Sequence, residues 1–95
     1  MKNVLIVSAD PEITEVIVRL VNGYEGFQGE SISAVDQLSA TLEKSAFDIL
    51  LLGAGFTEQE EGRIKETASL INPELKVIEH YGGGSGLLLE ELHRV

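Results

Sequence analysis

The feature that most constrains the fold is a fourfold alternation of strand-like segments with segments of helical character. The strand-like segments lie at 3–7, 25–32, 47–52 and 75–79, and 25–32 has the weakest strand pattern because Gly26 and Gly29 interrupt it and polar residues occupy both faces. Strands that alternate with helices form parallel sheets, because each crossover helix returns the chain to the same end of the sheet. The sequence therefore predicts one α/β domain over residues 1–95, a doubly wound parallel sheet with helices on both faces.

Capping residues mark where the first two helices begin. Asp10 precedes Pro11, an N-cap followed by a residue suited to the first helical turn. Gly23 is expected to end the first helix in the left-handed conformation. Residues 33–36 predict a capping box before the second helix. Apolar residues with helical spacing are expected to face the core: Ile13, Val16, Ile17, Leu20 and Val21 in the first helix, and Val35, Leu38 and Leu42 in the second.

The second half of the chain repeats this organisation. The run 49–52 is apolar on both faces, as expected of a central strand covered by helices. Thr57 and Glu60 predict a second capping box, which opens a helix that stops at Asn72. A glycine-rich connection at 82–86 then precedes a closing helix at 87–95. Right-handed crossovers place the first helix on one face and the next two on the other, so the closing helix is expected beside the first.

Charge and composition exclude several classes of partner. Seven basic and sixteen acidic residues give a net charge of −9. Phosphate backbones and anionic membranes require clustered Lys and Arg, so neither nucleic acid nor membrane is an expected partner. The chain has no cysteine, no apolar run long enough for a membrane span and no signal-peptide pattern. A cytoplasmic protein is the expectation.

The order and spacing of several motifs resemble the receiver domain of bacterial response regulators. They are the run 4–7 leading into Asp10-Pro11, the pair Gly23-Tyr24, and the strand 47–52. The resemblance implies a flavodoxin-like sheet with strand order 2-1-3-4. It also implies a place in two-component signalling or a phosphorelay.

The same resemblance implies that the receiver chemistry is missing. Receivers hold Mg²⁺ with two acidic residues directly after the first strand, and these places fall on Ser8 and Ala9, with Asp10 one step later. The phosphoacceptor aspartate corresponds to Gly53. The hydroxyl-bearing switch residue falls on Tyr81 or His80, and the last strand with its lysine has no counterpart. The sequence is thus interpreted as a degenerate, shortened pseudo-receiver, with no catalytic residue, metal or cofactor, and not an enzyme.

The sequence is compatible with two functions of different classes. A third, an enzyme with an unusual nucleophile, is disfavoured. The first is a protein-interaction module whose expected partner is a second copy of the chain or a signalling protein. The homodimer would form through the exposed edge of the fourth strand with His80, Tyr81 and Leu89. The alternative is a site for a small ligand or phosphate at the carboxyl edge of the sheet, around Gly53 and Gly82–Ser85. A dinucleotide fingerprint is disfavoured at Gly53, since Glu58 occupies the place of its third glycine.

Overall fold

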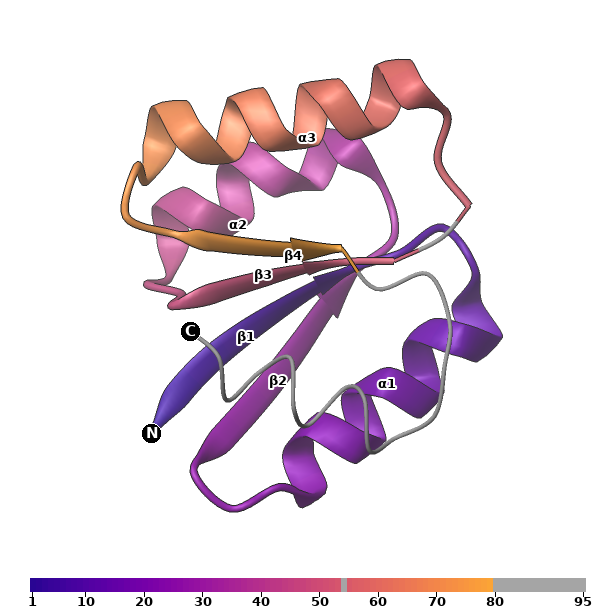
Figure 1. Ribbon diagram of the computed structural model, residues 1–95, viewed down its shortest axis with the longest axis vertical. Helices are drawn as coiled ribbons and strands as arrows, with labels where there is room; N and C mark the ends of the chain where they lie inside the picture. Colours follow the sequence, from indigo (N-terminus) through magenta and orange to yellow (C-terminus); the bar gives the residue numbers. More distant parts are fainter. Residues whose placement is uncertain (54, 80–95) are drawn as a thin grey trace.

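The computed structural model describes residues 1–53 and 55–79, and all structural statements below concern these residues. Strands and helices alternate along the described chain (Figure 1). The elements are β1 (Lys2–Val7), α1 (Pro11–Gly23), β2 (Phe27–Ile32), a 3-10 turn η1 (Val35–Gln37), α2 (Leu38–Lys44), β3 (Ile49–Leu52), α3 (Glu58–Ile71) and β4 (Lys76–Glu79).

The four strands form one parallel sheet in the order β2-β1-β3-β4. α1 covers one face, and α2 and α3 lie side by side on the other (Figure 1). The predicted strand order and the predicted placement of the first three helices are therefore confirmed. β2 and β4 form the two lateral edges of the described sheet. The predicted closing helix lies outside the described residues.

Strict alternation along the two central strands divides the core into two layers. Val4 and Ile6 of β1 face α1, where they pack with Ile17 and Val21. The intervening residues of β1 face the opposite layer, which α2 and α3 cover. That layer contains Leu5, Val7, Leu38, Leu42, Phe47, Leu50, Leu52, Ile64, Ala68 and Leu75. Both faces of β1 and β3 are thus buried, as the two-sided apolar run predicted.

Two of the predicted helix starts have the expected capping bonds. The Oδ1 atom of Asp10 accepts hydrogen bonds from the backbone N–H groups of Glu12 and Ile13, at 3.0 and 3.3 Å. Thr57 and Glu60 form the full capping box, with reciprocal bonds of 3.0 and 3.2 Å between side chain and backbone. These local bonds satisfy N–H groups that a helix start would otherwise leave without a partner.

The capping box predicted at 33–36 is wrong. The chain instead forms η1, whose N-cap Ala34 makes no side-chain capping bond. The Ser33 N–H donates instead to the side-chain Oε1 of Gln37, at 3.3 Å. Asp36 has one methylene fewer than the Glu or Gln that a capping box uses, so the longer Gln37 side chain makes this contact from one position later.

Two expectations for α1 also need correction. Gly23 is the last residue of the helix and does not have a positive φ, whereas Gly26 in the following turn has φ of 88°. Ile13 and Val16 remain 44% and 53% exposed, although both belong to the predicted apolar stripe. The sheet contacts one side of the helix, so Ile17 and Val21 are buried while these two residues lie on its flank.

Candidate functional site

Parallel strands bring their carboxyl ends to one edge of the sheet, where doubly wound proteins bind their ligands. Here that edge carries the residues that follow β1 and β3 (Figure 1). Ser8, Ala9 and Asp10 follow β1 directly, and Gly53 follows β3 directly. The structure therefore brings together the described residues that the resemblance placed at a receiver's phosphorylation site.

The β1 loop is fixed by its own hydrogen bonds. Ser8 is fully buried, and its Oγ accepts a bond from the Asp10 N–H at 3.3 Å. The Ser8 N–H donates to the carbonyl of Ile32 at the end of β2. The Oδ1 of Asp10 is occupied as the cap of α1. The Asp10 carboxylate is thus engaged by its own helix.

The β3 loop packs directly against the β1 loop. The Gly53 N–H donates to the Val7 carbonyl at 2.8 Å, which holds the loops together. A Cβ atom at Gly53 would lie 2.9 Å from the Ser8 Cβ and 3.1 Å from its Oγ. Gly55 has φ of 102°, and a Cβ there would lie 2.8 Å from the Ala9 Cβ. The space in which a side chain at residue 53 would project is therefore filled by Ser8.

The charges around these loops do not suit an anion. The first turn of α3 carries Glu58, Glu60 and Glu61. These carboxylates complement the helix dipole and repel a phosphate that approaches the same helix N-terminus. No group of three His, Asp or Glu side chains that could hold a metal ion occurs in the described part of the chain. The acidic side chains beside Gly53 thus disfavour an anion at this half of the predicted ligand site, which stays a prediction.

Several predicted site residues lie outside the described residues. They are His80, Tyr81, the connection Gly82–Ser85 and Leu89. Their part in an interface or an anion site stays a prediction.

An ion pair joins α3 to the end of β4. The Lys65 ammonium group donates to the Glu79 carboxylate. That hydrogen bond raises the pKa of Lys65 above its ordinary value of 10.5, against a smaller opposing effect of desolvation. Both side chains are partly exposed, so the pair is a surface contact.

The outer edge of β2 is occupied almost entirely by side chains of its own chain. The N–H groups of Lys2 and Ser8 donate to the carbonyls of Gly26 and Ile32, respectively. Every second residue from Gly26 onward therefore directs its backbone N–H and C=O toward β1, whereas Gly29 and Ser31 direct theirs outward. Asn22 satisfies Gly29 twice: its Oδ1 accepts from the Gly29 N–H at 2.8 Å, and its Nδ2 donates to the Gly29 carbonyl at 3.3 Å.

Sequence reasoning missed this role of Asn22, the residue before the predicted helix stop at Gly23. The Asn-Gly pair at 22–23 followed by a second glycine at 26 is the signal that could have found it. An asparagine amide carries both a donor and an acceptor, and it can therefore substitute for a neighbouring strand.

The outer edge of β4 has no such side-chain cover among the described residues. Lys76 donates to the carbonyl of Asp48 at 3.2 Å, so Lys76 and Ile78 face β3 and Val77 faces outward. No hydrogen bond to the backbone of Val77 occurs within the described part of the chain, and its side chain is 37% exposed. Unpaired groups of this kind are a template for another strand.

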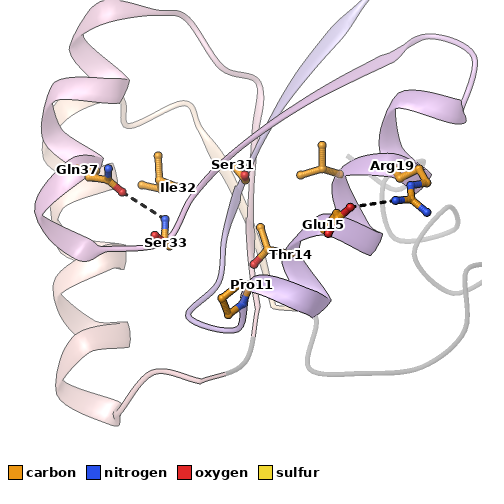
Figure 2. Close-up of a pocket in the computed structure, with 9 residues that line it drawn as sticks. Pro11, Thr14, Glu15, Arg19, Ser31, Ile32, Ser33 and Gln37 are labelled. Atoms are coloured by element: carbon orange, nitrogen blue, oxygen red, sulfur yellow. Dashed lines mark hydrogen bonds and ion pairs between the residues drawn. The ribbon is translucent and has the colours of Figure 1, made fainter.

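A groove of about 590 Å³ lies between α1 and the outer edge of β2. Figure 2 shows Pro11 and Thr14 facing Ser31 across it, with the Ser33–Gln37 hydrogen bond on one side and the Glu15–Arg19 ion pair on the other. The resemblance to receivers assigned nothing to this place, and sequence patterns gave no sign of it.

Comparison with solved structures decides the fold family. The chain is similar to a Burkholderia thailandensis protein assigned to pilus assembly (CpaE), with a TM-score of 0.70 and 25% identity over 99% of this chain and 79% of that one. It is also similar to a pilus assembly-related protein of Burkholderia pseudomallei, with a TM-score of 0.68 and 25% identity over 99% and 72% of the two chains. The chemotaxis protein CheY4 of Vibrio cholerae, a receiver domain, matches with a TM-score of 0.70 over 100% and 98%, at 14% identity.

The described chain has a receiver-like fold. The CheY4 match covers almost the whole of both chains, and the four-stranded parallel sheet of the described residues fits the flavodoxin-like fold of that protein, which confirms the fold that the resemblance implied. No protein-family model matches the receiver-like domain, and a search of curated proteins finds no significant match. None of the helices within 1–53 and 55–79 has the length and apolar character needed to cross a bilayer.

Proposed function

We propose that this receiver-like domain works without phosphorylation, as a protein-interaction module of the two-component type. The observation that carries the proposal is the contact between Ser8 and Gly53, which occupies the space that a phosphoacceptor side chain would need. On this proposal the domain has no enzymatic activity and acts in the bacterial cytoplasm.

The chemistry of acyl phosphate formation supports the first half of the proposal. Transfer of a phosphoryl group to a carboxylate needs the nucleophile itself and a metal ion that neutralises the charge of the phosphate. Gly53 supplies no carboxylate, and Ser8 and Ala9 supply neither of the two carboxylates with which a receiver holds Mg²⁺. Asp10 alone offers one carboxylate, and its Oδ1 already caps α1.

The outer edge of β4 supports the second half. The backbone groups of Val77 face outward, and its partly exposed side chain adds an apolar contact. We propose that a second copy of the chain pairs with this edge to form a homodimer. In an antiparallel arrangement the Val77 residues of two copies can exchange both of their backbone hydrogen bonds about a twofold axis.

The two similar Burkholderia proteins suggest where such a module acts. Both are named for pilus assembly. A protein partner in pilus assembly is therefore the context that we propose for this domain.

Phosphorylation is tested by the intact mass of the full chain after incubation with acetyl phosphate and Mg²⁺. The mass is expected to stay unchanged, while a receiver that carries the acidic residues gains one phosphoryl group under the same conditions. A stoichiometric adduct that hydroxylamine removes would show an acyl phosphate and would overturn the proposal.

A further inference from the structure

We propose that the groove beside β2 binds an extended peptide segment of a partner protein, one residue of which pairs with Ser31. This surface lies at the opposite lateral edge of the sheet from β4, so it is independent of the proposed homodimer. Three features of the groove lead to this occupant: its free backbone groups, the position of its cavity and its charge.

Ser31 offers both backbone groups of an outward-facing strand residue. Among the described residues, neither its N–H nor its C=O has a hydrogen-bond partner outside the sheet, whereas Gly29 is bound by Asn22 and the Ser33 N–H by Gln37. A single free residue between two occupied ones suits an antiparallel partner, because there one residue exchanges both bonds with its opposite residue. In a parallel arrangement the two backbone groups of Ser31 would instead bond to two different residues of the partner.

The cavity lies where the side chain of the paired residue would project. Directly opposite residues of an antiparallel pair place their side chains on the same face of the sheet. Ser31 is in register with Ile6, which belongs to the core layer under α1. The side chain of the partner residue would therefore enter the groove beside Thr14 and Val18. A groove of about 590 Å³ accepts an apolar side chain of valine size together with adjoining backbone.

Charge favours basic residues on either side of the paired residue. The chain carries a net charge of −9. Glu15, which lines the groove, is paired with Arg19 at 3.0 Å, and Asp36, in η1 next to the lining residue Gln37, lies 4.0 Å from Arg63. The acidic charge that favours a basic segment is therefore the net charge of the whole chain, and long-range attraction to it speeds association.

The test uses a defined probe, the peptide acetyl-Lys-Thr-Val-Thr-Lys-amide, titrated into the full chain labelled with ¹⁵N and ¹³C. Binding is expected to shift the backbone amide of Ser31 and the methyl signals of Thr14 and Val18. The same peptide with an N-methylated central valine loses the donor to the Ser31 carbonyl, and it should bind about tenfold more weakly. A peptide with glutamate in place of both lysines should also bind more weakly.

A matched pair of variants tests the same contact from the protein side. Ser31→Pro removes the outward N–H, a change that an edge strand tolerates, and it should weaken binding about tenfold. Ser31→Ala keeps the backbone donor and should bind as the unchanged chain does. The proposal is overturned by shifts centred on Val77 instead of Ser31, by equal binding of the N-methylated peptide, or by no shift at millimolar peptide. The comparison of the two peptides on the unchanged chain stands even if the proline variant does not fold.

Discussion

At the carboxyl end of the sheet Ser8 fills the space beside Gly53, whereas at the outer edge of β4 the backbone of Val77 has no hydrogen-bond partner among the described residues. The first region is where a receiver does chemistry, and here two loops pack closely against each other. The second is a strand edge of a kind that other chains bind. The difference teaches that a receiver-like sheet can have closely packed loops at its carboxyl end while backbone groups at a lateral edge have no partner among the described residues.

The largest expected effect comes from adding one methyl group at the closed end. Gly53→Ala places a Cβ 2.9 Å from the Ser8 Cβ. Overpacking of this kind should lower the free energy of unfolding by about 2 kcal/mol. Urea denaturation of the full chain measures the change.

Gly62 provides the matched control. It lies in α3, and a Cβ there meets nothing within 4 Å. Gly62→Ala should therefore stabilise the chain by about 0.5–1 kcal/mol, because alanine favours the helix. Equal changes in the free energy of unfolding for the two substitutions would show that the loops have room for a Cβ at Gly53. The packed loops around Gly53 would then no longer contrast with the open edge of β4.

The next effect tests how the β2 edge differs from the β4 edge. Asn22→Ala removes both bonds to Gly29, at 2.8 and 3.3 Å, and should cost about 1–2 kcal/mol. Hydrogen exchange at the Gly29 amide should become faster. Gln28→Ala on the same strand is the control, since Gln28 is exposed and should change little. Unchanged exchange at Gly29 would mean that Asn22 does not protect this edge.

The parts of the fold that the sequence predicted depend on local or periodic signals. The order of strands followed from the alternation of elements and the resemblance, and the caps at Asp10 and Thr57 need only residues two or three positions away. The box at 33–36 failed because side-chain reach decides between Asp36 and Gln37, and the motif does not encode that reach.

The parts that the sequence did not predict depend on contacts between elements. Ser8 and Gly53 were both identified from the sequence, but their packing depends on two loops that meet only in the folded sheet. Asn22 reaches Gly29 because the chain turns at Gly26, whose φ of 88° sets the path into β2. The outward backbone groups of Ser31 differ from those of Gly29 and Ser33 only because no described side chain binds them. No sequence pattern indicates that difference.

A substitution at the outer edge of β4 is expected to change the free energy of unfolding less than the substitutions above. Val77→Pro removes an outward N–H that no described residue binds, so the free energy of unfolding should stay nearly unchanged. Self-association in sedimentation velocity should weaken strongly, because the pairing of β4 edges loses its donors. Val77→Thr keeps the backbone and should associate as the unchanged chain does. Unaltered association of the proline variant would exclude the β4 edge as the dimer contact.

The smallest effect concerns the ion pair at the end of β4. Since Glu79 raises the pKa of Lys65 above 10.5, the pair's contribution to stability is complete below that pH and is lost as pH rises through the folded pKa. Lys65→Met should therefore remove a slight decline in stability at strongly alkaline pH. Urea denaturation of both chains between neutral and alkaline pH measures it. The difference should be small because both side chains are partly exposed.

Sedimentation velocity of the full chain, with and without acetyl phosphate and Mg²⁺, tests the central claim most directly. A receiver-like domain with a closed phosphorylation site and an open β4 edge should associate at micromolar concentration to the same extent under both conditions. A chain that remains monomeric under both conditions would contradict the proposed interaction edge. Association that appears only with acetyl phosphate and Mg²⁺ would contradict the closed site.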